Sequence, residues 1–255
     1  VAITASMSSR TRRSRPSMSR RAAPALAYRE TISGVHERRI RASILTREGA
    51  TVTNLRQLFD GQVVIDANQD VTRMATVQFL DLHRQFGFDA DTYHGHDLQL
   101  SRMLRVWWMV SGPKLAKPLS IPVHTGPLVR LRRDGPVVTV EAQGKEAYGL
   151  TKARKTLTIK KGARRTDAIK MILREKMGET RLGAIPDLRA KLADDFIVGP
   201  GDLPWKKCLK LARSLDRQLF YGSDGVPYLR KSPTKIAWQF RGDHPYSGEI
   251  TSPVS

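Results

Sequence analysis

The chain has 255 residues, of which 40% are hydrophobic and 27% are charged. This composition is typical of a folded globular protein with some unstructured sequence. Forty-four Lys and Arg against 24 Asp and Glu give a formal net charge of +20 at pH 7, which attracts polyanions or acidic protein partners. The longest apolar candidate for a membrane span covers only residues 106–110, which excludes a spanning helix. The single cysteine, Cys208, excludes an internal disulfide and a zinc finger.

The chain begins with a basic, Ser/Arg-rich stretch that contains seven arginines and no acid before residue 30. Pro16 and Pro24 interrupt it and no hydrophobic periodicity is present, so it cannot offset the entropy of ordering on its own. We predict a disordered arm over residues 1–33. A mitochondrial transit peptide has a similar composition, but the arginines are too irregularly placed for a good amphipathic helix. The candidate partner-binding residues of the arm are Arg10, Arg12, Arg13, Arg15, Arg20 and Arg21.

Residues 34–143 show the alternation and β-branched content of strands, which predicts an antiparallel β domain. Residues 71–81 form the strongest strand pattern, with Phe79 as a candidate core residue. The segment 98–110 is a second long strand, with Trp107 as a candidate core residue. Further strands are expected at 38–46, 50–55, 62–66 and 137–144, and four prolines between 113 and 127 predict only short edge strands at 121–123 and 128–132.

After Gly144 the hydrophobic period approaches that of a helix, which predicts an α+β domain over residues 144–240. One helix is expected from an N-cap at Thr166 to Met177, with Gly178 as its C-cap. A second is expected from Leu203 to Phe220, with Pro204 in its first turn and Trp205 and Leu209 as candidate core residues. An aromatic hairpin that turns at residues 223–225 follows, and residues 241–255 form a C-terminal tail.

The sequence contains no legible catalytic constellation. His94 and His96 could share a metal ion, but the third ligand would have to be Asp89, Asp91, Asp97 or the more distant His83, so a solvated loop is favoured. Cys208 lies on the apolar stripe of the second predicted helix, where a thiol acts as a small hydrophobe. A lysozyme-like enzyme or a peptidase would need a carboxylate pair or a metal cluster. We therefore expect no enzyme activity, no metal and no cofactor.

Basic residues also cluster outside the arm, at residues 38–41, 130–133, 152–161 and 206–210. Together they could bind a phosphate backbone without sequence preference. The tryptophans, however, fall in strands or on the helix stripe, which indicates core positions and not a stacking platform for bases. A sequence-nonspecific RNA- or DNA-binding protein of ribosomal or organellar type is therefore the alternative function.

Three segments together resemble baseplate and tail-tip hub proteins, the minor tail proteins of tailed bacteriophages. Residues 61–81 resemble their opening strands, in which a Gly-led strand, an Asp, an Arg and a closing strand recur. Residues 121–150 resemble the next block, with a Thr-Gly-Pro turn, a hairpin at Asp-Gly and a Gly-Lys-Glu before a short helix. Residues 203–230 resemble the later helix and its aromatic hairpin. The order matches, and the resemblance covers roughly residues 34–232.

This resemblance implies a structural virion protein made in the host bacterial cytoplasm. Its first domain would be a tail-tube-like β-barrel, followed by the α+β domain. The implied assembly is a homotrimer at the tip of the tail tube, around the DNA conduit. The implied partners are the distal tail protein, the tape measure and further hub or tip proteins, with transient contact to passing DNA. Members of the family usually continue into a second tube-like domain, whereas 25 residues follow Arg230 here. Either that domain is absent or another chain supplies it.

Overall fold

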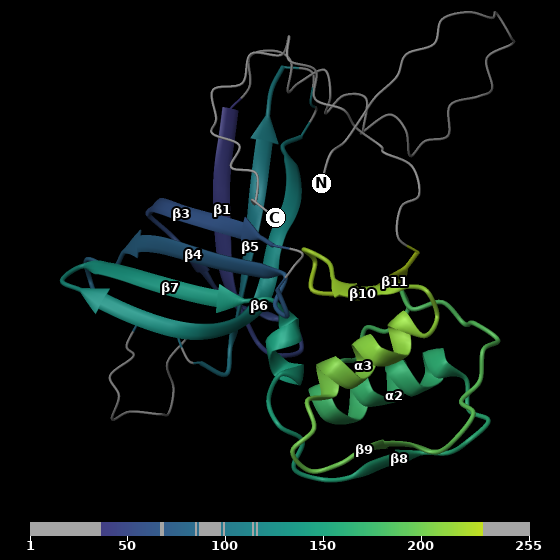
Figure 1. The fold of residues 1–255 in the computed structure, drawn as a ribbon. Coiled ribbons are helices and arrows are strands. Elements are labelled where there is room, and N and C mark those ends of the chain that lie inside the picture. Colours follow the sequence, from purple (N-terminus) through teal and green to yellow (C-terminus); the bar gives the residue numbers. More distant parts are fainter. Residues whose placement is uncertain are drawn as a thin grey trace, which may run out of the picture.

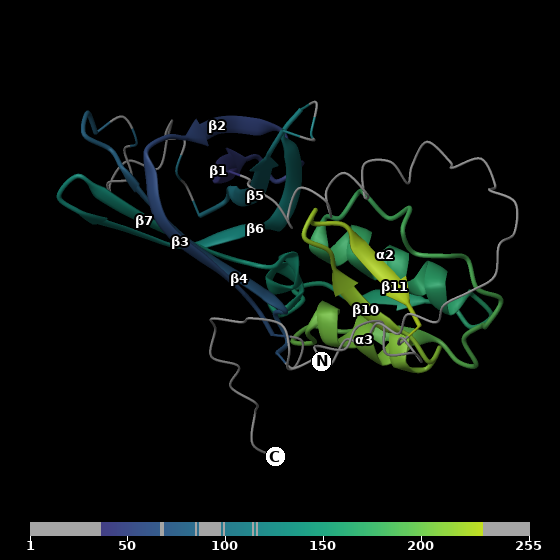
Figure 2. The same cartoon turned by 90° about the horizontal axis from the view of Figure 1, so that it is seen from above.

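The fold consists of a curved β-sheet and a smaller α+β unit that lie side by side (Figures 1 and 2). The structure is a computed structural model that describes residues 37–66, 69–84, 86, 98, 100–113, 115 and 117–231. The six arm arginines, His94, His96 and the C-terminal tail therefore lie outside the described residues. The β-strands before Gly144 are β1 (Glu37–Leu45), β2 (Thr51–Leu55), β3 (Leu58–Ile65), β4 (Arg73–Leu80), β5 (Met103–Ser111), β6 (Leu119–Asp134) and β7 (Val137–Gln143).

These seven strands form one antiparallel sheet in the order β2-β1-β5-β6-β7-β4-β3. One face of β4 and β7 carries the apolar residues of the core, because side chains alternate along a strand. Phe79 is fully buried there and its ring meets that of Phe86 edge to face, with 5.2 Å between the centroids. The other members of this core include Ile44, Val77, Leu104, Val106, Val138 and Val140.

The sheet is open, which corrects the expectation of a barrel. The edge strands β2 and β3 have no pairing with each other among the described residues. Only Arg56 and Gln57 separate them in the chain, and Gln57 has a φ of +53°. The two strands consequently meet at one corner and diverge from it, as Figure 2 shows. A groove of about 510 Å³ is lined instead by residues of β1, β3, β4, β5 and β6, with Ile40, Val63 and Trp108 among them.

The prediction of short, proline-broken strands between 113 and 132 is wrong, because β6 runs unbroken over 16 residues. Pro122 lies opposite Trp107 and Pro127 opposite Met103, and the register of β6 shifts beside each proline. Such irregularities are where a ladder tolerates a residue without an N–H group. The long strand bends there and belongs to both halves of the curved sheet.

Trp107 does not lie in the sheet core. It is half-buried on the face of β5 opposite to Leu104 and Val106. The guanidinium groups of Arg41 and Arg105 lie 5.3 and 5.7 Å from its ring, which is a cation–π arrangement. The apolar run that suggested a core position in fact presents alternate residues to opposite faces of the sheet.

The α+β unit follows β7 directly and contains all the helices that the structure describes. Its elements are η1 (Lys145–Gly149), β8 (Leu157–Ile159), α2 (Arg165–Met177), β9 (Phe196–Val198), α3 (Pro204–Arg213), β10 (Gln218–Tyr221) and β11 (Pro227–Arg230). Strand β8 pairs with β9, and β10 pairs with β11. None of these helices has the length and apolar character that crossing a bilayer requires.

Both α-helices differ from their predicted bounds. Thr166 is not the N-cap of α2, because Arg164 occupies that position and the Thr166 hydroxyl instead accepts a hydrogen bond from the Leu188 N–H at 3.4 Å. Gly178 caps the C-terminus in the left-handed conformation, as expected. Helix α3 ends at Arg213, not at Phe220, since Asp216 adopts a φ of +52° and β10 begins two residues later.

A second core fills the space between α2, α3 and the β10–β11 hairpin. Trp205 is fully buried, and its ring lies 5.4 Å from that of Tyr221. Leu209 is partly buried and packs against this core. Its other members include Ile169, Ile172, Leu173, Cys208, Leu219 and Leu229.

Candidate functional site

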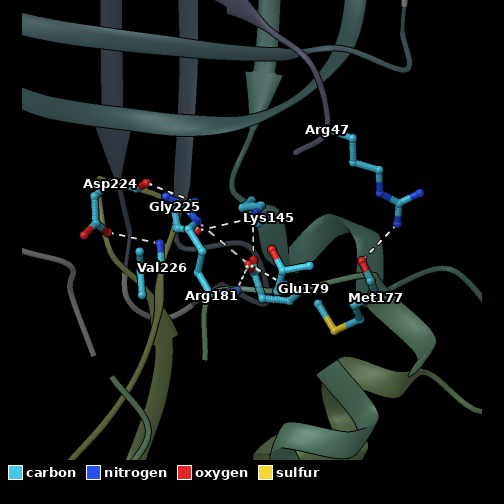
Figure 3. A network of polar contacts seen from close by, with 9 residues as sticks. Arg47, Lys145, Met177, Glu179, Arg181, Asp224, Gly225 and Val226 are labelled. Carbon is cyan, nitrogen blue, oxygen red and sulfur yellow. Dashed lines mark hydrogen bonds and ion pairs between the residues drawn. The ribbon is translucent and has the colours of Figure 1, made fainter. Parts of the chain in front are cut away.

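The densest polar network in the described chain lies where the curved sheet meets the α+β unit (Figure 3). We call it the junction. At its centre the ammonium of Lys145, the first residue of η1, pairs with the carboxylate of Glu179. Both side chains are buried, with exposed fractions of 6% and 2%. Burial lowers the pKa of Lys145, and the Glu179 carboxylate opposes that shift. Water does not hydrate these two buried charges, so each charge is stabilised mainly by the other.

The loop after α2 supplies the acid of this pair. Gly178 ends the helix, and Glu179 then accepts hydrogen bonds from the backbone N–H groups of Thr180 at 3.0 Å and Arg181 at 2.9 Å. The Arg181 side chain is 3.9 Å from the same carboxylate. One acid therefore fixes the loop backbone and also holds two cations.

These two cations donate hydrogen bonds to the turn of the β10–β11 hairpin. The Gly225 carbonyl accepts from the Arg181 guanidinium at 2.8 Å and from the Lys145 ammonium at 3.3 Å. Asp224 shapes the turn, because its carboxylate accepts from the Val226 N–H at 3.0 Å and the Tyr228 hydroxyl at 2.9 Å. Gly225 has a φ of +71°, which favours glycine.

The sheet contacts the same turn through β6. The Thr125 hydroxyl donates to the Ser223 carbonyl at 2.9 Å and accepts from the Arg105 Nε at 3.1 Å. A Cβ atom on Gly225 would lie 2.8 Å from the Thr125 Cγ2. The hairpin backbone thus packs directly on the sheet, and only a glycine fits between them.

Arg47, two residues after β1, makes a further link between the units. Its Nη2 donates to the Met177 carbonyl at 2.9 Å, and its guanidinium lies 4.6 Å from the Tyr148 ring. This carbonyl belongs to the last turn of α2, which has no further helical partner for it. The arginine therefore caps α2 from the sheet side.

Glu146 follows Lys145 and is a second buried acid at the junction. Its Oε1 accepts from the Thr72 hydroxyl at 2.7 Å and lies 3.4 Å from the Tyr221 backbone nitrogen. Its Oε2 has no hydrogen-bond partner among the residues that the structure describes. Burial raises the pKa of Glu146, and the hydrogen bond from Thr72 opposes the shift.

His124 is a buried polar residue of β6 near the same end of the sheet. Within the described part of the chain, neither of its ring nitrogens has a hydrogen-bond partner. Burial, with a smaller contribution from the charge of Arg73, lowers its pKa to about 4. His124 is therefore neutral near pH 7.

The contacts of the junction hold several segments of the chain together. A cavity of about 200 Å³ lies beside Arg47, Lys145 and Glu179. Lys145 and Arg181 lie against the Glu179 carboxylate, and the Arg47 guanidinium donates to the Met177 carbonyl. Across the described ranges, no group of three or more His, Cys, Asp or Glu side chains is arranged to hold a metal ion. Cys208 is fully buried, and burial raises the pKa of its thiol.

The sequence contains one signal for this site. Lys145 and Glu146 stand next to each other in the Gly-Lys-Glu stretch at the change from strand to helix, where two opposite charges precede an apolar segment. The junction also unites residues from all three resembling segments. The candidate core residues Phe79 and Trp205 instead lie in the two cores that it connects.

No protein-family model matches the sequence, and no curated protein matches it significantly. Solved structures with a similar arrangement include a tail protein from Neisseria meningitidis MC58, at 13% identity and a TM-score of 0.44 over 74% of this chain and 50% of that one. The 43 kDa tail protein of prophage MuSo2 from Shewanella oneidensis is similar at 11% identity and a TM-score of 0.45, over 76% of this chain and 53% of that one.

A chain of the Francisella PdpA–VgrG complex is similar at 10% identity and a TM-score of 0.48, over 82% of this chain and 35% of that one. The chain spans about half the length of the two tail proteins and a third of the length of the Francisella chain. The structural neighbours of this chain are thus tail proteins and a chain of a VgrG complex.

Proposed function

We propose that this chain is a structural protein of a phage tail. In this proposal it forms part of the tail-tip or baseplate hub, which closes the tail tube and connects it to other tail proteins. It acts without catalysis, metal or cofactor. The curved antiparallel sheet followed by an α+β unit is the order of parts that the resemblance implies.

The observation that carries the proposal is the convergence of the three resembling segments. Thr72 of the first segment donates to Glu146 of the second, at 2.7 Å. Thr125 of the second donates to Ser223 of the third, at 2.9 Å. The three segments that carry the resemblance therefore lie in contact within one folded unit. Segments that together form one junction are what a shared structural unit predicts.

In this role the chain assembles as a homotrimer and contacts the distal tail protein, the tape measure and further hub or tip proteins. The edge strands β2 and β3 each carry one unpaired backbone edge among the described residues, and such edges favour strand pairing between chains. The arm arginines bind acidic patches on neighbouring tail proteins, with only transient contact to passing DNA. The protein is located in the virion after synthesis in the host cytoplasm.

Disruption of the gene in its phage or prophage tests this role. We expect induced lysates to contain filled heads but no complete tails by negative-stain electron microscopy, and a plasmid copy to restore tails. Native mass spectrometry of the purified chain should give three copies in the assembled species. Intact, infectious particles that lack the chain would refute the tail role.

A specific observation keeps nucleic-acid binding as the second candidate. Residues 145–231 contain 21 Lys and Arg but only 10 Asp and Glu, so over half of the net charge of +20 belongs to the α+β unit and not to the arm. A binder of phosphate backbones loses affinity linearly in the logarithm of the salt concentration, with a slope that counts the phosphates neutralised. Filter binding of duplex DNA over a salt series distinguishes the two functions, because a tail protein should show no tight complex at physiological salt.

A further inference from the structure

A second cleft, of about 460 Å³, lies between the β3–β4 connection and the α3–β10 side of the α+β unit. Ile65, Asp70 and Thr72 are on its first wall. Leu209 of α3 contributes apolar surface, the buried Trp205 lies behind it, and strand β10 contributes all four of its residues. The junction contacts described above do not fill this cleft.

Strand β10 presents a free backbone edge to the cleft. Among the described residues it pairs with β11 alone, and the Gly222 N–H bonds to the Val226 carbonyl at the end of that ladder. Hydrogen-bonded and non-bonded positions alternate along an antiparallel pair, so Leu219 and Tyr221 direct their N–H groups away from β11. The Tyr221 N–H accordingly faces Glu146, at 3.4 Å. The N–H and carbonyl of Leu219 lie on that same outer edge.

The charge around this edge is positive. Arg213 and Arg217 line the cleft, and neither has an acidic partner among the described residues. The acid on the opposite wall, Asp70, pairs with Lys206 at 3.1 Å. A ligand with carboxylates therefore finds two free guanidinium groups beside an unpaired strand edge.

We propose that this cleft binds an extended, acidic peptide segment of a partner protein, which adds to β10 as a further strand. Backbone groups of the segment pair with Leu219, and its carboxylates pair with Arg213 and Arg217, whose planar donors suit a carboxylate. Its alternate apolar side chains meet Leu209 and Ile65, which also line the cleft. A free strand edge selects a peptide over a nucleic acid, because only a peptide can complete the ladder. The proposal is independent of the tail role, since peptide binding and virion location are measured separately.

The test uses the full chain and a fluorescent peptide, acetyl-Glu-Val-Glu-Val-Glu-Val-amide, with the Lys-for-Glu version as its control. We expect the acidic peptide to bind and to slow hydrogen exchange at the Leu219 amide, whereas the basic peptide does neither. The double variant Arg213→Glu, Arg217→Glu should weaken binding at least tenfold. The matched control Arg154→Glu, Lys155→Glu makes the same charge change at exposed positions outside the cleft and should bind the acidic peptide nearly as well as the parent chain does.

Several results would overturn the proposal. One is the absence of binding at millimolar peptide, and another is an equal loss of affinity in both double variants, which would indicate attraction by net charge alone. Protection of the Leu219 amide in the free, dilute chain would mean that another segment of the same chain occupies the cleft. Protection that grows with protein concentration would mean that a second copy occupies it.

Discussion

The ammonium of Lys145 and the carboxylate of Glu179 form a buried ion pair that joins the start of η1 to the loop after α2, 34 residues apart in the chain. The Gly225 carbonyl lies within hydrogen-bond distance of the same ammonium. This single pair therefore connects three segments of the α+β unit at the surface that the sheet contacts.

Lys145→Met should destabilise the fold by about 3 kcal/mol, because it leaves the Glu179 carboxylate buried without its nearest cation. Urea unfolding followed by circular dichroism measures the loss. The control Lys160→Met removes the exposed pair with Asp195, 2.9 Å apart, and should leave the unfolding midpoint almost unchanged. Equal midpoint shifts in the two variants would mean that the buried Lys145–Glu179 pair contributes no more to stability than the exposed Lys160–Asp195 pair.

His124 should make the protein less stable as the pH falls from 6.5 to 4. Its pKa in the folded chain is about 4, below the ordinary value, so the unfolded chain binds more protons in this window and unfolding becomes easier. The expected loss is on the order of 2 kcal/mol between pH 7 and pH 4.5. Urea midpoints measured at both pH values should differ less in His124→Leu than in the parent, and an unchanged difference would contradict the buried, neutral histidine.

Gly225→Ala should loosen the β10–β11 hairpin from the sheet. The substitution combines a left-handed backbone with a Cβ atom 2.8 Å from the Thr125 side chain, and we expect a cost of about 2 to 3 kcal/mol. Gly135 is the matched control, because it has a φ of +57° but nothing within 4 Å of a Cβ, so Gly135→Ala should cost about 1 kcal/mol. Thermal unfolding of both variants measures the contrast, and equal losses would show that Gly225 does not pack on Thr125 as described.

Trp205→Ala and Phe79→Ala should each cost about 3 to 5 kcal/mol, because each removes a fully buried aromatic side chain from one of the two cores. Trp107→Ala should cost less than half as much, since that ring is half-buried on the outer face of β5. Denaturant titrations of the three variants provide the comparison. A loss below about 1 kcal/mol at Phe79 or Trp205 would mean that its side chain is not buried in the core described above.

Cys208 should not react with a thiol reagent in the native protein. The thiol is completely buried, and burial raises its pKa, so little nucleophilic thiolate forms at neutral pH. Addition of Ellman's reagent should release colour only after denaturant is added. Rapid stoichiometric reaction of the native chain would argue for an accessible thiol and reopen the possibility of a reactive cysteine.

The sequence predicts most of the elements because their signals are local. The alternation around Phe79 is sufficient for β4, and Gly178 is sufficient for the end of α2. The curvature of the sheet is not local, because it depends on how β6 bends beside Pro122 and Pro127 and on where β2 and β3 diverge. Those prolines suggested broken strands, since the pattern of one strand does not reveal which N–H groups its neighbours need.

The junction was beyond prediction for a similar reason. Lys145 and Glu179 are two charged residues among many, and nothing in their neighbourhood marks them as buried. Their pairing depends on where α2 ends and on how the β10–β11 turn packs against β6. A lysine next to a glutamate at the change from strand to helix occurs at exposed as well as buried positions. Only the surrounding fold shows that these two side chains are buried.

The proposal that this chain is a structural component at the tip of a phage tail is tested most directly by a cryo-electron microscopy reconstruction of the parent particle. We predict density at the distal end of the tail tube that fits the curved sheet and its α+β unit, in three copies, with the β10–β11 turn on β6. Gradient-purified particles that contain no trace of the chain by mass spectrometry, and no such density, would contradict it.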